Sequence, residues 1–97
     1  MKKEYFIQAT IKCDEGAECF AKFNLGHDAE FASSLFRKLK GKRVVREQDV
    51  LNMEFVEMKD ELPFSIDIIT CTLEELGENS KIITREIFKS KLLSSTD

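Results

Sequence analysis

The stretch YFIQATIKCDEGAECFAKFNL, residues 5–25, alternates apolar and other side chains on both sides of a short acidic turn. A period of two residues is typical of β-strands with one face against a core. Gly16 can adopt the positive φ that often closes a three-residue hairpin loop. The stretch therefore predicts a β-hairpin with both apolar sets on one face. The expected register places these pairs opposite each other: Cys13 and Ala17, Ile11 and Cys19, Ile7 and Phe23.

The next segment, HDAEFASSLFRKLKG at residues 27–41, changes to helical spacing. Its apolar side chains recur every three or four positions, as they do on the buried stripe of an amphipathic helix. Asp28 suits the N-cap, and Gly41 suits the position after the last helical turn. We therefore expect a helix here, with these residues facing the core: Phe31, Ala32, Leu35, Phe36 and Leu39.

Residues 50–58, VLNMEFVEM, are compatible with a strand or a helix. Their apolar side chains fit either a two-residue or a four-residue period. The following stretch, PFSIDIITCTL at residues 63–73, is rich in β-branched residues and alternates like a strand. The two segments can pair as a hairpin, so we predict a strand for residues 50–58 and a strand for residues 63–73. The expected pairs are Met58 with Pro63, Phe55 with Ile66, and Met53 with Ile68.

The final stretch, TLEELGENSKIITREIFKSKLL at residues 72–93, predicts helix. Thr72 and Glu75 have the spacing of a capping box. Gly77 and Asn79 suggest a break, with the main helix beginning near Ser80. The apolar residues beyond that point spread widely around the helix axis, more widely than one sheet face can cover.

The order strand, strand, helix, repeated once, predicts a single α+β domain over residues 1–97. The expected architecture is a two-layer sandwich of ββαββα order. Its sheet has four mostly antiparallel strands, and both helices lie on one face of it.

Charge and composition exclude several classes of protein. The chain has 15 Lys and Arg against 18 Asp and Glu, and the formal net charge of −3 does not favour general binding to nucleic acid. The apolar runs are too short to span a bilayer, so we expect no membrane association. Three cysteines at irregular spacing imply no closed disulfide framework. We therefore expect a cytoplasmic, reducing setting and no cofactor.

The run FRKLKGKRVVR, residues 36–46, holds six basic side chains and no acid. One interpretation is a nucleic-acid-binding domain that contacts phosphates through this run. The favoured interpretation is the solvated end of a helix and its loop, because cations suit a helix C-terminus and acids follow closely. The candidate anion contacts are Arg37, Lys38, Lys42, Arg43 and Arg46.

The thiols and the single histidine are the only candidates for metal or nucleophile chemistry. A zinc site or a Cys–His dyad would draw on Cys13, Cys19, His27 and Cys71. The spacing fits neither well, so we expect Cys13 and Cys19 to be small buried strand residues with no metal bound. No glycine-rich phosphate loop or nucleophile elbow is present, and we predict that the protein is not an enzyme.

Several large apolar residues remain after the core is assigned. Those expected on the outer face of the sheet are Phe6, Phe20, Val56 and Met58, with Ile69 if its strand is bulged. On the last helix, Phe88 and Leu92 are expected to remain outside the core. Surplus apolar surface usually marks a partner site, although scattered single residues are normal. The sequence therefore predicts a small non-catalytic interaction or regulatory module that forms a homodimer or binds another protein.

Overall fold

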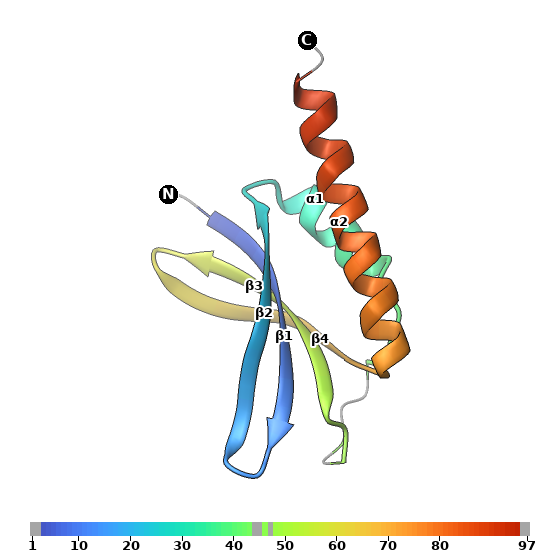
Figure 1. Ribbon diagram of the computed structural model, residues 1–97. Helices are drawn as coiled ribbons and strands as arrows, with labels where there is room; N and C mark the ends of the chain where they lie inside the picture. The colour runs from blue at the N-terminus through green and yellow to red at the C-terminus, as the bar shows by residue number, and fades with distance from the viewer. Residues whose placement is uncertain (1–2, 44–45, 47, 96–97) are drawn as a thin grey trace.

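The chain folds into four strands and two helices (Figure 1). The computed structural model describes residues 3–43, 46 and 48–95. The elements follow in the order strand, strand, helix, strand, strand, helix, as the sequence predicts, and they make an α+β fold. They are β1 (Lys3–Cys13), β2 (Gly16–Gly26), α1 (Ala29–Arg37), β3 (Leu51–Lys59), β4 (Leu62–Cys71) and α2 (Leu73–Ser95).

The four strands form one sheet in the order β2-β1-β3-β4, and each neighbouring pair is antiparallel. Strand, rather than helix, is confirmed for most of residues 50–58, because β3 pairs with β1 on one side and β4 on the other. The two hairpins are therefore joined through their inner strands, β1 and β3. This leaves β2 and β4 as the edges of the sheet.

The β1–β2 hairpin keeps its predicted register on one side of a β-bulge and loses it on the other. Ile7 lies opposite Phe23, as predicted. Nearer the turn, the register shifts by one and places Ile11 opposite Glu18 instead of Cys19. The turn is therefore one residue shorter than expected, because a bulge takes up an extra residue on one strand.

The β3–β4 hairpin shows the same behaviour. Met58 lies opposite Pro63, as predicted, but beyond a bulge Met53 faces Ile69 instead of Ile68. The shift turns Ile69 into the core, where it is 3% exposed. The expectation that Ile69 could join the outer face is therefore wrong, because one extra residue in a strand exchanges its two faces.

Helix α1 begins where the sequence predicts and ends earlier. The Asp28 carboxylate accepts hydrogen bonds from two N–H groups of the first turn, which the helix itself leaves without partners. The helix ends at Arg37, so Gly41 does not cap it. Gly41 instead passes so close to β4 that a Cβ there would lie 2.8 Å from the Thr70 carbonyl oxygen. Its role is therefore close approach, since glycine alone has no Cβ.

Helix α2 is continuous from Leu73 to Ser95, so the predicted break near Ser80 is wrong. The capping box is confirmed: the Thr72 hydroxyl accepts from the Glu75 N–H, and the Glu75 carboxylate accepts from the Thr72 N–H. Asn79 is fully buried, and its amide accepts from the Lys40 N–H at 2.7 Å and donates to the Lys40 carbonyl at 2.8 Å. This residue therefore anchors the segment after α1 and does not interrupt the helix.

The core is one cluster that combines the sheet with both helices. Phe55 lies at its centre, with ring centroids 5.4 Å from Phe36 and 6.0 Å from Tyr5. Rings at these distances contribute beyond the area that they bury. The cluster comprises Tyr5, Ile7, Ala9, Leu25, Ala32, Leu35, Phe36, Met53, Phe55, Ile69 and Ile83.

The molecule is elongated, with principal extents of 48 × 31 × 20 Å. The β1–β2 hairpin extends past the helices at one end, and α2 extends past the sheet at the other (Figure 1). The projecting part of the hairpin and the projecting part of α2 are each left without a covering layer. Within residues 3–43, 46 and 48–95, no helix combines the length and apolar character needed to cross a bilayer.

Candidate interaction surface

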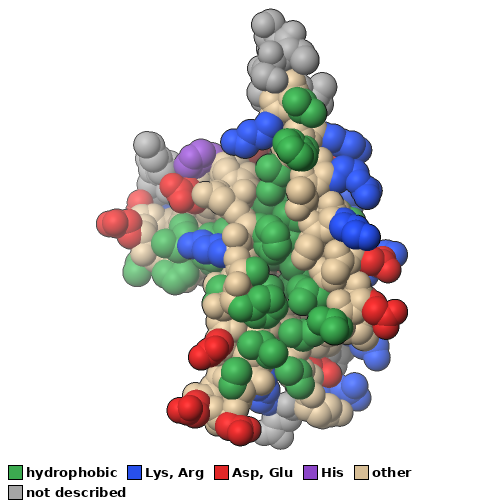
Figure 2. Space-filling view, viewed as in Figure 1, with side chains coloured by type: hydrophobic (Ala, Val, Ile, Leu, Met, Phe, Trp, Pro, Cys, Tyr) green, Lys and Arg blue, Asp and Glu red, His purple; other side chains and the backbone are tan. Residues whose placement is uncertain are grey.

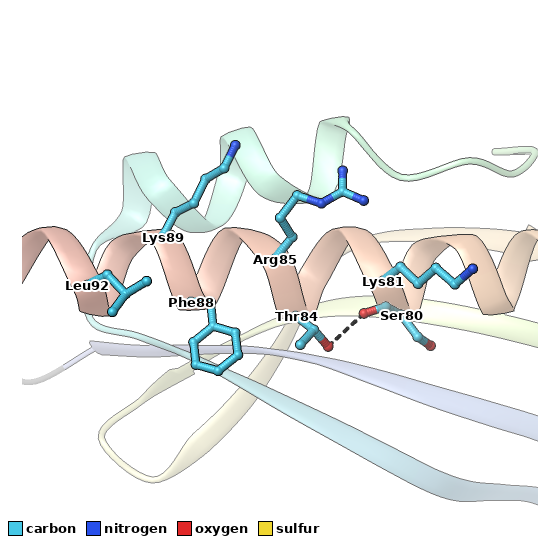
Figure 3. A pocket seen from close by; sticks show the side chains of 7 residues that line it. All are labelled: Ser80, Lys81, Thr84, Arg85, Phe88, Lys89 and Leu92. Atoms are coloured by element: carbon cyan, nitrogen blue, oxygen red, sulfur yellow. Dashed lines mark hydrogen bonds between the residues drawn. The ribbon is translucent and has the colours of Figure 1, made fainter.

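A row of side chains lies along the solvent side of α2 (Figure 3). The row consists of Ser80, Thr84, Phe88 and Leu92, which we call the α2 row. Residues four positions apart on a helix lie on the same face, so the row is a continuous stripe. Phe88 is 65% exposed and Leu92 is 59% exposed. The row therefore has two small residues at one end and two large apolar ones at the other.

The two hydroxyl groups of the α2 row are used within the helix. The Ser80 hydroxyl donates to the Leu76 carbonyl, and the Thr84 hydroxyl donates to the Ser80 carbonyl, which is the bond drawn in Figure 3. Such bonds to the preceding turn are common for Ser and Thr in helices. The row therefore presents little polar character, despite containing two hydroxyl residues.

Three cations flank the α2 row: Lys81, Arg85 and Lys89, which we call the basic rim. In Figure 3 the Lys89 and Arg85 side chains project on one side of the helix and Phe88 on the other. The row and the rim lie along one wide and shallow depression on the surface of α2, which we call the groove. Lys89 lies 3.6 Å from the Glu86 carboxylate, whereas Lys81 and Arg85 have no ion pair with any described residue. The groove is therefore apolar with a positively charged edge.

The end of the β1–β2 hairpin has the opposite charge. Every residue from 11 to 20 is exposed, including the acids Asp14, Glu15 and Glu18. Two large apolar side chains accompany the acids: Phe20 is 51% exposed, and Ile11 is 36% exposed. We call residues 11–20 the acidic end.

One face of the molecule connects these two regions (Figure 2). Hydrophobic side chains form a band that runs along α2 and down to the end of the β1–β2 hairpin. Acidic side chains gather at the lower end of the band, and basic side chains line the outer edge of the upper part of α2. A band of this kind exceeds the scattered single apolar residues that any surface carries.

The residues that the sequence assigned to a partner surface divide into two groups. Phe20, Phe88 and Leu92 are exposed, and Met58 is partly exposed. Phe6 and Val56 are 7% and 3% exposed, so the expectation that they are available to a partner is wrong. They lie opposite each other in the sheet, and the Lys22 ammonium lies over the Phe6 ring, 4.0 Å from its centroid. This part of the sheet is therefore covered by the chain's own side chains.

Other exposed apolar side chains were not expected. Leu62, Phe64 and Ile66 of β4 are exposed although Phe64 and Ile66 alternate like core residues. Ile66 is the extra residue of the bulge in β4, and Leu62 and Phe64 lie between this bulge and the turn. Alternation alone does not reveal a bulge, so the sequence contains no direct signal for their exposure.

The basic segment at residues 37–46 has acidic partners within the chain. One of them is Glu78, whose carboxylate lies 2.6 Å from the Lys40 ammonium. This hydrogen bond raises the pKa of Lys40 and lowers the pKa of Glu78. The hydrogen bond from Lys38 likewise lowers the pKa of Glu86. The pairs of the segment are Lys38 with Glu86, Lys40 with Glu78, Arg43 with Asp67, and Arg46 with Asp49.

Two further candidates lie in the same segment. Arg37 is the last residue of α1 and is exposed. Lys42 exchanges two backbone hydrogen bonds with Thr70, which ties the segment to β4. Three of the five candidate anion contacts, Lys38, Arg43 and Arg46, therefore already pair with acids of the chain, and Lys42 is bonded through its backbone to β4.

The cysteines do not lie where the sequence predicts. Cys13 and Cys19 are exposed, so their expected burial is wrong, because the end of the hairpin extends past the helices. Cys71 is partly buried beside Asn79, and burial, with the Glu75 charge, raises the pKa of its thiol to about 11. Its thiolate is therefore scarce at neutral pH.

The imidazole of His27 is engaged with the backbone, with Nδ1 2.9 Å from the Lys3 carbonyl oxygen. Among the residues that the structure describes, no three His, Cys, Asp or Glu side chains gather as metal ligands. Among the described residues no hydrogen bond joins a thiol to the imidazole, and the described surface offers apolar contact and charge.

Comparison of the chain with protein-family models, with curated proteins and with solved structures finds no match.

Proposed function

We propose that the protein is a small non-catalytic interaction module that self-associates as a twofold dimer. In the proposed arrangement both helices cover one face of the sheet, and the outer stripe of α2 remains for a second copy. Phe88 is the observation that carries the proposal: a large aromatic side chain, 65% exposed, in a groove bounded by Leu92 and the basic rim.

The energetic reason is the apolar area that α2 exposes. Burying a side chain such as Phe or Leu completely contributes about 1.5–3 kcal/mol. Phe88 and Leu92 lie one turn apart, so a single partner surface can cover both. Dimers with closed twofold symmetry are the commonest soluble oligomers, so we propose this arrangement.

Nucleic-acid binding through residues 37–46 remains the alternative, and nothing at the segment favours it. Four of its six cations, Lys38, Lys40, Arg43 and Arg46, pair with acids of the chain, and a polyanion would have to displace those acids. The chain's net charge of −3 adds a weak repulsion.

Two observations support the non-catalytic part of the proposal. The raised pKa of Cys71 makes its thiol a poor nucleophile, and the His27 ring nitrogen Nδ1 is occupied by a backbone carbonyl. Three free cysteines agree with a reducing compartment, and we place the protein in the cytoplasm on that basis.

Light scattering at high micromolar protein concentration tests the proposal. The native chain should have twice the mass of one copy, and Phe88→Ser should have the mass of a monomer. Leu73→Ser is the matched control, because Leu73 is 74% exposed on the same helix but does not line the groove. The control should remain a dimer. A monomeric native chain at these concentrations would show that the proposal is wrong.

A further inference from the structure

We infer that the dimer is held by reciprocal docking, in which the acidic end of each copy binds the α2 row and basic rim of the other. This inference rests on the proposed self-association and assigns the surface that covers the groove. The partner is a second copy of this chain, and each copy contributes both halves of the interface.

Charge complementarity is the first reason. The acidic end holds three acids, Asp14, Glu15 and Glu18, and one Lys. The basic rim holds three cations, of which Lys81 and Arg85 have no ion pair with a described residue. Opposite charges set against each other across an interface favour association and fix its orientation.

The apolar groups match as well. Phe20 and Ile11 are exposed in the same ten-residue segment as the acids of the hairpin, and the α2 row runs beside the cations of the helix. When the acids meet the rim, these side chains can meet the row. Burial of the aromatic and aliphatic groups supplies the attraction, while the surrounding charges determine which surfaces meet.

The placement of the two regions allows both contacts to form at once. The acidic end lies at one end of the long molecule, and the exposed half of α2 lies at the other (Figure 1). The hydrophobic band joins them on the same face (Figure 2). A twofold axis can pack this face of one copy against the same face of the other, with the two long axes in opposite directions. Each acidic end then meets the groove of the other copy.

The main alternative is an antiparallel pairing of the two α2 helices. In such a pair, flanking positions on the same side of each helix face one another. The basic rims of the two copies would then lie opposite each other, and like charges across an interface are unfavourable. Reciprocal docking avoids this repulsion and is the arrangement that we propose.

Two double charge reversals test this mode of docking. One changes the helix, Lys81→Glu with Arg85→Glu, and the other changes the hairpin, Asp14→Lys with Glu15→Lys. The matched control for the hairpin reversal is Asp60→Lys with Glu61→Lys, which makes the same change of charge at the turn between β3 and β4. Circular dichroism and thermal melting establish that each variant folds.

Each reversal should weaken self-association by about 100-fold, because two like-charged surfaces then meet. An equimolar mixture of the helix and hairpin variants should form a mixed dimer, since acid meets base at both contacts. The control should dimerise like the native chain.

The outcomes separate this inference from the proposed function. A native dimer that survives both reversals, or two monomeric variants that do not combine on mixing, overturns reciprocal docking and leaves self-association standing. A native chain that is monomeric under all conditions overturns both.

Discussion

The two basic parts of this chain, residues 37–46 and the rim of α2, hold their cations in different surroundings. In the first, four of the six cations, Lys38, Lys40, Arg43 and Arg46, lie within ion-pair distance of an acid of the same chain, and Arg37 and Lys42 have no such pair with a described residue. In the second, Lys81 and Arg85 border exposed apolar side chains and have no such pair with a described residue. The density of charge is greater in the first part, yet the proposed contacts lie in the second.

The difference shows which charged residues are useful for predicting a binding site. A cation that already pairs with an acid of its own chain must give up that contact before it binds another group, so its net contribution to binding is small. A cation beside exposed apolar surface gives up little, and burial of its neighbours excludes water from the new pair. The surroundings of a charged residue therefore matter more than the number of charges in a run.

The largest predicted effect concerns the anchor of the first part. Asn79→Ala removes the amide that bonds both the N–H and the carbonyl of Lys40. Leaving these groups without partners should lower the free energy of unfolding by about 2 kcal/mol. Urea denaturation at low protein concentration measures it.

Ser80→Ala, the neighbouring substitution, is the control for Asn79→Ala, since its hydroxyl bonds only within α2. It should change stability by less than about 0.5 kcal/mol. Equal effects of the two substitutions would mean that Asn79 does not anchor the segment.

The second prediction concerns Cys71, which lies beneath the same segment, with its sulfur 3.5 Å from the Lys40 carbonyl oxygen. Because its pKa is raised from 9.0 to about 11, it should hold about 100-fold less thiolate near pH 8 than a cysteine of ordinary pKa. At a protein concentration low enough to keep the chain monomeric, alkylation followed by peptide mass analysis should find Cys71 modified far more slowly than the exposed Cys13 and Cys19. Equal rates at the three thiols would contradict the burial of Cys71.

A smaller effect is expected from the cations of the first part. Lys42→Gln, Arg43→Gln and Arg46→Gln together should lower the free energy of unfolding by no more than about 1–2 kcal/mol, because exposed ion pairs contribute little. The dimer mass should not change. The native chain should show no specific affinity for a generic oligonucleotide at physiological salt. Micromolar binding that the triple substitution abolishes would instead identify the segment as a nucleic-acid site.

Much of the fold follows from local patterns in the sequence. Alternation identified the strands, and the capping residues Asp28 and Thr72 marked where the helices begin. The errors arose where distant residues decide the outcome. Asn79 looked like a helix breaker, but its partner Lys40 lies 39 positions away in sequence. The bulges in both hairpins reversed face assignments that a strict period of two had made.

The exposure of the candidate partner residues was predicted in part. Phe88 and Leu92 are exposed, as expected from the apolar residues of the last helix, which spread too widely for one sheet face. Phe6 and Val56 were misjudged, because the Lys22 side chain that covers Phe6 comes from the neighbouring strand. The basic rim was missed altogether, since Lys81, Arg85 and Lys89 are separated in sequence and form a line only on the helix.

The dissociation constant of the native dimer, measured by sedimentation at rising salt, tests the central claim most directly. If acidic ends and basic rims hold two copies together, raising salt from about 50 mM to about 500 mM should weaken the dimer by roughly tenfold, because salt screens opposite charges. If the two basic rims faced each other, or if apolar contact acted alone, salt would leave the dimer unchanged or strengthen it. A dimer that tightens with salt would contradict reciprocal docking.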